Sequence, residues 1–293
     1  MRNVLIRLVC AEAVLVATAS GAIIYNNLTP NNQIAIATRP GSAGVTEIEA
    51  ADDFILTGAG IVNSASFVGL LVPGPTGGSV SITDVVVEMY RVFPLDSGPP
   101  SVGRVPTRVN SPSDVAFDSR DSLSAGELSF TTAQLSATFT AMNSIQPGGI
   151  HPIPNVLTMG NGPITGQEVQ INVTFLTPFS LPADHYFFVP QVALSNGGVF
   201  YWLSASRPIT GAGTTPFPTG VTDLQAWTRD APLDPDWLRV GMDIVGPPPG
   251  SAVASTFNAA FSLDGTVAPE PSPVILLAAG LALLSLRKLL PNV

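Results

Sequence analysis

The sequence predicts an all-β protein whose body, residues 23–266, is one antiparallel β-sandwich of jelly-roll type. Three observations lead to this fold class. Several segments alternate between apolar and polar residues, which is the pattern of a strand with one face in water. Stretches rich in Pro, Gly, Ser and Asn separate these segments, and signals for helices are few. Short strands divided by such turns are typical of antiparallel sandwiches, and no change of composition divides the body into two domains.

The expected strands follow from these local patterns. Residues 169–175 alternate strictly between apolar and polar side chains, which predicts a strand with one wet face. Residues 85–93 are apolar on both faces apart from Glu88 and Arg91, which predicts a more buried strand. Further strands are expected at 54–57, 61–72, 128–139 and 257–264.

A hairpin is expected in the second half of the body. Two segments rich in aromatic residues, 185–189 and 199–203, are separated by a short polar stretch that contains Asn196-Gly197. Asn-Gly favours the tight turn that joins two antiparallel strands, because both positions accept a positive φ. We therefore expect these two segments to pair with each other.

Helical signals are limited to two short segments. Residues 234–239 begin with Asp-Pro, which suits the N-cap and the first position of a helical turn. Residues 222–228 are a second candidate for a single turn. The stretches 94–127 and 144–166 are expected to be irregular, because they are rich in turn-forming residues.

Residues 1–22 have the features of an export signal that forms a helix. Arg2 and Arg7 accompany a mostly apolar stretch of small residues, and small-x-small sequences suited to cleavage follow at 17–19 and 20–22. Because Arg7 and a glutamate interrupt the apolar stretch, an uncleaved N-terminal anchor is the alternative.

An apolar run, 274–286, lies close to the C-terminus and is followed directly by Arg287 and Lys288. Extended over about 273–290, a helix here is roughly 27 Å long at 1.5 Å per residue. That length is just sufficient for a hydrocarbon core about 30 Å thick when the two cations reach to the interface. The run therefore predicts a transmembrane helix, and the basic residues after it predict that its C-terminal end is cytoplasmic.

The tripeptide Pro269, Glu270 and Pro271 lies between the polar body and this span. With the apolar run and the basic tail, it gives residues 267–293 an arrangement that resembles the PEP-CTERM sorting signal of bacterial surface proteins. The resemblance implies that an exosortase, an integral-membrane cysteine transpeptidase, recognises and processes the tripeptide region. It also implies a Gram-negative bacterium that makes exopolysaccharide. A plain C-terminal anchor with a chance Pro-Glu-Pro is the alternative.

The body carries a weaker resemblance of its own. Residues 51–56 and 236–241 are similar to segments of extracytoplasmic β-domains that recur upstream of this sorting signal. No settled activity belongs to those domains, so the resemblance implies architecture and location alone.

The composition excludes several classes of protein. Charged residues make up 11% of the 293-residue chain, against about 25% in an average soluble domain. Without its two termini, the body keeps eight bases, all arginine, and 19 acids. It has no basic stripe, so we expect no nucleic-acid partner. The single cysteine, Cys10, lies in the export segment, which excludes a disulfide scaffold and a Cys-ligated zinc site.

Calcium is the metal that this sequence could bind, and no other cofactor is expected. Asp114, Asp118 and Asp121 lie in one expected loop, and three further aspartates lie within 230–236. Secreted β-sandwich domains bind Ca²⁺ through loop carboxylates of this kind. Neither cluster matches an EF-hand loop, and each contains an arginine, so ion pairs and Asx-turns are the alternative.

Catalysis by a histidine or by two carboxylates has little support. The two histidines are His151, in an expected loop, and His185, at the start of a strand. Asp184 and His185 are adjacent in that strand and point to opposite faces, so the acid cannot orient the base. The sequence has no Gly-x-Ser-x-Gly elbow. A glycosidase needs two carboxylates across a cleft, and the sequence singles out no such pair.

Aromatic rings are the candidates for carbohydrate binding. Trp202 belongs to an expected strand and is expected to be buried. Trp227 and Trp237 lie in a less regular region, so we expect them to be exposed and able to stack on sugars.

The sequence as a whole indicates an exported, non-enzymatic protein of the cell surface or extracellular matrix, anchored in the membrane by its C-terminal helix. An exosortase-type transpeptidase is the expected partner. Two alternatives remain: a carbohydrate-binding module for exopolysaccharide, and a secreted glycan-active enzyme that uses an unrecognised pair of carboxylates.

Overall fold

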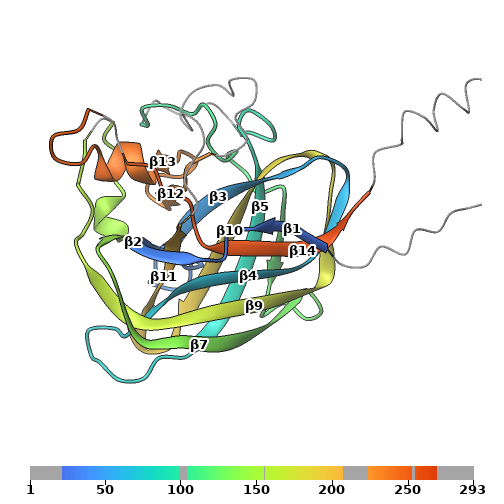
Figure 1. Cartoon of the computed structure of the whole chain (residues 1–293), viewed down its shortest axis with the longest axis horizontal. Helices are drawn as coiled ribbons and strands as arrows, with labels where there is room; N and C mark the ends of the chain where they lie inside the picture. The colour runs from blue at the N-terminus through green and yellow to red at the C-terminus, as the bar shows by residue number, and fades with distance from the viewer. Residues whose placement is uncertain (1–21, 99–103, 155, 207–223, 253–254, 269–293) are drawn as a thin grey trace, which may run out of the picture.

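The computed structural model describes residues 22–98, 104–154, 156–206, 224–252 and 255–268. Within these residues the protein is mostly antiparallel β-sheet, which confirms the expected all-β class (Figure 1). One ladder, between β2 and β8, is parallel. The strands are β1 (Ala22–Asn26), β2 (Pro30–Ala37), β3 (Ile48–Leu56), β4 (Gly60–Val72), β5 (Ile82–Arg91), β6 (Asp118–Asp121), β7 (Leu128–Ala141), β8 (Asn143–Ile145), β9 (Ile164–Leu181), β10 (Asp184–Leu194), β11 (Val199–Ala205), β12 (Trp227–Asp230), β13 (Leu238–Arg239) and β14 (Phe261–Val267).

Hydrogen bonding arranges these strands in two groups. In the first group, β7 pairs with β9 and β9 with β4, while β14 and β11 share the other edge of β4. β1 extends this group beyond β14, and β2 extends it beyond β11. The second group has the order β6-β5-β10-β3-β12-β13. The two groups meet where Ala193 of β10 pairs with Val199 of β11, and at the bridge between Arg39 and Ile48.

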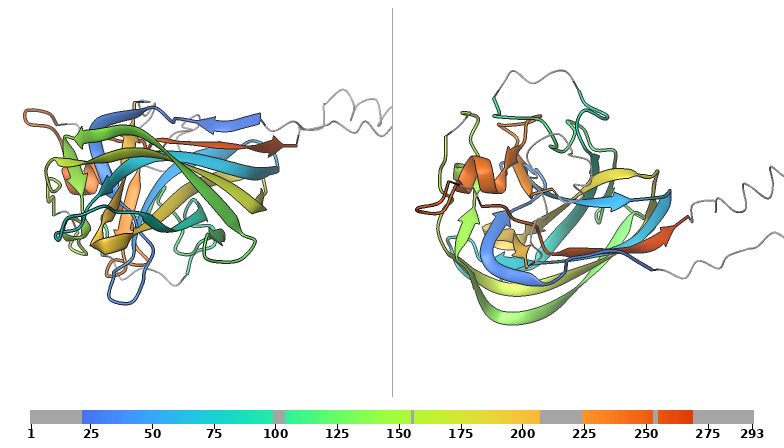
Figure 2. Two further views of the ribbon diagram at one scale, coloured as in Figure 1. Left: turned by 90° about the horizontal axis from the view of Figure 1, so that it is seen from below. Right: turned by 45° about the horizontal axis from the view of Figure 1, so that its top comes forward.

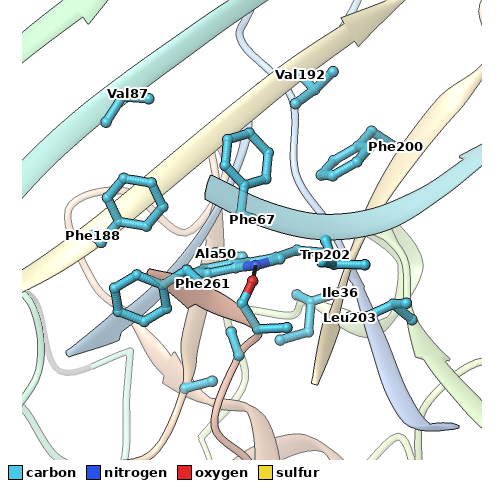
Figure 3. Packing of buried hydrophobic residues seen from close by; sticks show 14 of the residues in the cluster. Ile36, Ala50, Phe67, Val87, Phe188, Val192, Phe200, Trp202, Leu203 and Phe261 are labelled. Carbon is cyan, nitrogen blue, oxygen red and sulfur yellow. Dashed lines mark hydrogen bonds between the residues drawn. The ribbon is translucent and has the colours of Figure 1, made fainter. Parts of the chain in front are cut away.

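Aromatic side chains from both groups pack together between them. Phe188 of β10 lies 6.1 Å from Phe67 of β4 and 5.0 Å from Phe261 of β14, measured between ring centroids. Trp202 of β11 packs on Phe188 and donates a hydrogen bond from Nε1 to the Ala260 carbonyl at 3.0 Å (Figure 3). All four rings are fully buried, as expected for Trp202. These buried rings therefore belong to one core cluster to which both groups of strands contribute.

The expected hairpin is only partly formed. The turn η2 (Ser195–Gly197) has φ of 56° at Asn196 and 67° at Gly197, as an Asn-Gly turn requires. However, β10 and β11 pair at one residue position alone. The expectation of a full hairpin was wrong because β3 and β5 pair with β10 while β4 and β2 pair with β11, so the two strands separate into different groups.

The expectation of two helical turns was also wrong. The described part of 222–228 leads into β12, and the end of 234–239 is β13. The Asp-Pro signal belongs to a turn instead: the Asp236 N–H donates to the Leu233 carbonyl at 3.1 Å, which encloses Asp234-Pro235. The helical segments that the structure describes are two 3₁₀ turns, η1 (Pro147–Gly149) and η2, and a π-helix, η3 (Val240–Val245).

The expected signal helix and transmembrane helix lie outside the described residues, apart from Ala22, which begins β1. At the other end of the body, β14 ends at Val267. Within the described ranges, no helix is both long and apolar enough to cross a membrane.

Candidate functional site

The first aspartate cluster is held by ion pairs and turn hydrogen bonds. Asp114 pairs with Arg108, and Asp118 pairs with Arg120 at 2.6 Å. Asp121 accepts a hydrogen bond from the Leu123 N–H at 2.6 Å, which forms an Asx-turn. Among the described residues, no group of three or more His, Cys, Asp and Glu side chains could hold a metal ion. The three aspartates are thus not gathered into one metal-binding group, and ion pairs and an Asx-turn account for their positions.

The second aspartate cluster is used in the same way. Asp230 Oδ1 accepts a hydrogen bond from the Leu233 N–H at 3.1 Å, and Asp234 pairs with Arg229 at 2.9 Å. The Asp236 carboxylate lies 3.7 Å from Arg108 and 3.8 Å from Arg104. Asp234 and Asp236 therefore compensate buried or half-buried arginines, while Asp230 stabilises a turn.

The tryptophans are not a sugar-binding surface. Trp227 is 0% exposed and Trp237 is 1% exposed, so the expectation that both are exposed was wrong. They pack in a second, smaller hydrophobic cluster with Tyr90 and Phe187. Trp202 is buried as well, so all three tryptophans of the chain lie in the interior and none is available for stacking on a glycan.

A cluster of charged and aromatic side chains, which we name the Arg229 cluster, consists of Glu49, Glu88, Tyr90, Arg229 and Trp237. Arg229 on β12 lies directly opposite Glu49 on β3 in the strand register. Its Nη2 donates to Glu49 Oε1 at 3.0 Å and to the Tyr90 hydroxyl at 2.9 Å. Its guanidinium lies 4.3 Å from the centroid of the Trp237 ring. The cluster thus joins β3, β5, β12 and the segment before β13.

Protonation in this cluster follows from its burial. Burial raises the pKa of Glu88 to about 8, and the negative charges of Glu49 and Glu47 add to the effect. Burial also raises the pKa of Tyr90 far above its usual value, so the phenol stays neutral. Desolvation disfavours the charge of Arg229, but the negative charge of Glu49 outweighs it and raises the pKa of the arginine. Glu49 and Arg229 therefore form the ion pair of the cluster, while Glu88 is the group that exchanges a proton near neutral pH.

Sequence reasoning did not find this cluster. Glu49 precedes the first strand expected in this region, and the pattern gave no indication that β3 and β12 are neighbours. The one available signal was Glu88 within an otherwise apolar strand.

An aspartate–histidine pair was also missed. His185 Nε2 lies 2.6 Å from Asp53 Oδ2, and Asp53 also accepts a hydrogen bond from the Leu224 N–H at 2.9 Å. Burial raises the pKa of Asp53, and the contact with His185 partly offsets the rise. Asp184 binds the backbone N–H of His185 instead of its ring, and His151 lies in the loop after η1.

Two surface pockets contain neither an acid nor a histidine. One, of about 430 Å³, is lined by Met142, Met159, Pro248, Phe257 and their neighbours. The other, of about 400 Å³, lies beside the η2 turn and contains Arg39 as its charged side chain. Neither pocket provides the carboxylate pair that a glycosidase requires.

The residues of the expected sorting signal, Pro269, Glu270, Pro271, Arg287 and Lys288, lie outside the described residues. Comparisons of the chain with protein-family models, with curated proteins and with solved structures found no match.

Proposed function

We propose that this chain is an exported, non-enzymatic protein of the cell surface or extracellular matrix, delivered by a PEP-CTERM sorting signal. The observation that carries the proposal is the order of the C-terminal segment: Pro269-Glu270-Pro271, then the apolar run 274–286, then Arg287 and Lys288. An exosortase-type membrane transpeptidase is the partner that processes this tail.

The tail performs the delivery in three parts. Burial of the run 274–286 in lipid holds the chain in the membrane, and Arg287 and Lys288 keep the C-terminal end on the cytoplasmic side. The tripeptide is then presented at the outer face. Its two prolines disfavour helical backbone, which keeps Glu270 extended and accessible to the transpeptidase.

The body supports the non-enzymatic part of the proposal through its use of charge. Its acids compensate arginines in pairs such as Asp118–Arg120 and Arg239–Asp243, both at 2.6 Å. We also propose that the body is a β-sandwich of jelly-roll type. The aromatic contacts between the two groups of strands, such as the one between Phe67 and Phe188, favour that architecture.

Deletion of residues 269–293 tests the proposal. In a bacterium with an exosortase, the truncated chain should appear in the medium as soluble protein, because it lacks the membrane span. Fractionation of medium, soluble extract and membranes, followed by detection of the body, measures this directly. Retention of the truncated chain on the membrane would contradict the proposal.

A second variant separates anchoring from processing. Replacement of Pro269, Glu270 and Pro271 by alanine keeps the apolar run and the basic tail. This variant should remain in the membrane with its C-terminal tail uncleaved, whereas the unmodified chain loses the tail. Equal shortening of both chains would show that the tripeptide is not recognised.

A further inference from the structure

Strand β7 has one free edge along most of its length. Among the residues that the structure describes, β7 pairs along its ladder with β9 alone. Figures 1 and 2 show β7 as the outermost strand beside β9. Its backbone therefore presents unpaired N–H and C=O groups to the surroundings, which can serve as a template for another strand.

The side chains of β7 are also exposed on both faces. From Thr131 to Leu135 every residue is exposed, and Leu135 keeps 48% of its surface accessible. Within Leu128–Ala141 there is no charged residue and no proline. Natural proteins usually protect a long edge strand with such residues, so β7 lacks two of the common protections.

The sequence of β7 is nearly symmetric about Leu135. Read outward from this residue in either direction, the side chains are polar, alanine and threonine. When two copies run antiparallel with Leu135 opposite itself, similar residues face each other: Gln134 with Ser136, Ala133 with Ala137, and Thr132 with Thr138. At the next two positions, Thr131 faces Phe139 and Phe130 faces Thr140.

This register is one that symmetry permits. In an antiparallel pair of identical strands, the two-fold axis passes through the midpoint of one facing pair, so one residue must face itself. Like charges directly opposite each other are destabilising in a sheet, and β7 has none. Threonine pairs across strands are favourable.

Two irregularities in the β7–β9 ladder fall at the same place. The register shifts between Gln134 and Ser136 and again between Ser136 and Phe139, so two β-bulges bend the centre of β7, and pairing about Leu135 requires this segment to straighten. The Ser136 hydroxyl accepts a hydrogen bond from the Thr138 N–H at 3.3 Å and donates one to the Thr138 carbonyl at 2.9 Å. The N–H and C=O groups of Thr138 are thus already hydrogen-bonded within the chain. In a pairing where Leu135 is a hydrogen-bonded position, Thr138 is a non-hydrogen-bonded position, so the partner strand leaves these groups as they are.

From these observations we propose that β7 is a self-association edge. Two copies of this chain pair through β7 about a two-fold axis at Leu135, and the first group of strands continues from one copy into the other. The proposal does not depend on the sorting signal.

Cysteine cross-linking tests the contact at the axis. In the full-length chain with Cys10→Ser, the substitution Leu135→Cys places two thiols on facing residues whose Cα atoms are about 5.5 Å apart, which suits a disulfide. Mild oxidation should give a covalent dimer in much higher yield than for Leu123→Cys or Leu176→Cys, two positions that are 72% and 55% exposed away from this edge. Equal yields from the three variants would overturn the proposal.

Charge substitution gives an independent readout. Leu135→Lys places two like charges opposite each other, so sedimentation velocity should show association weakened by about tenfold or more. Leu135→Glu should behave in the same way, and an equimolar mixture of the two variants should associate again. Association of Leu135→Lys as tight as that of the unmodified chain would show that β7 does not lie in the interface. Cross-linking of Leu135→Cys in cells to a different protein alone would assign the edge to another partner.

Discussion

Arg229 and Glu49 are separated by 180 residues in the sequence, yet they face each other on β12 and β3. A buried pair of this kind adds little net stability, because desolvation offsets most of the attraction. Its effect is on register: a slip of β12 by one residue would turn Arg229 to the other face and leave Glu49 buried without its partner. The pair therefore selects the pairing of these two strands.

Glu88 gives a prediction about pH. Its pKa is raised from the ordinary 4.5 to about 8, so the native protein holds a proton that the unfolded chain has released between these two values. The free energy of unfolding should therefore fall as the pH rises through that window. Glu88→Gln removes this contribution. Relative to the unmodified chain it should gain stability at pH 8 and show a smaller decrease between pH 5 and pH 8, measured by urea unfolding.

Asp264→Asn is the matched control for that prediction, because it removes one negative charge from β14 at a distance from the Arg229 cluster. Burial also raises the pKa values of Asp53, Asp84 and Asp230, so the slope of the unmodified chain includes their contributions. The difference between the pH slopes of Glu88→Gln and of the unmodified chain therefore measures the contribution of Glu88. The same slope in Glu88→Gln and in the unmodified chain would contradict the assignment.

The close packing of β4 against β11 leads to a prediction about Gly69. It lies in β4 between Val169 of β9 and Trp202 of β11. A Cβ at this position would overlap the Phe200 ring and the Tyr201 carbonyl oxygen. Gly69→Ala should therefore lose about 1–3 kcal/mol of unfolding free energy through overpacking, measured by urea denaturation.

Gly148 provides the control for Gly69, since a Cβ there meets no atom within 4 Å and its φ is not positive. Gly148→Ala should leave the unfolding midpoint nearly unchanged. If both substitutions have the same effect, close packing of β4 against β11 is not the reason for the glycine.

Local pattern predicted both a strand with one polar face and a strand that is apolar on both faces. Residues 169–175 lie in β9, and 85–93 overlaps β5, as expected. The same pattern missed β1 and β2. The β2 sequence Pro30–Ala37 is polar in its first half and continuously buried in its second, so it shows no period of two. Asp-Pro at 234–235 suits a turn as well as a helix start, and the structure uses it in a turn.

The candidate sites were less predictable than the strands, because they depend on contacts between distant segments. Trp227 lies in an irregular stretch of sequence, but it becomes part of β12 and is covered by Leu224, Tyr90 and Phe187. Asp114 was grouped with Asp118 by sequence distance, whereas its partner is Arg108. Proximity along the chain therefore indicated the acids but not the arginines that compensate them.

For the molecule as a whole, the low charge content has two consequences. Among the described residues, eight acids pair with arginines, and the exposed strand β7 presents Ser, Thr and Gln to water instead of charges. The absence of charged residues from β7 also leaves its edge without the repulsion that keeps other edges apart. A surface or matrix protein that assembles through this edge would use both the polar, uncharged side chains of β7 and its unpaired backbone.

The mass of the mature protein isolated from cells tests the central claim, export followed by processing of the tail. The 293-residue chain has a mass of 30.3 kDa. We predict a shorter species that lacks the N-terminal export segment and ends near Pro269-Glu270-Pro271. Intact-mass spectrometry combined with sequencing of both ends identifies each processing event. A surface-located protein with the mass of the complete chain would contradict the account.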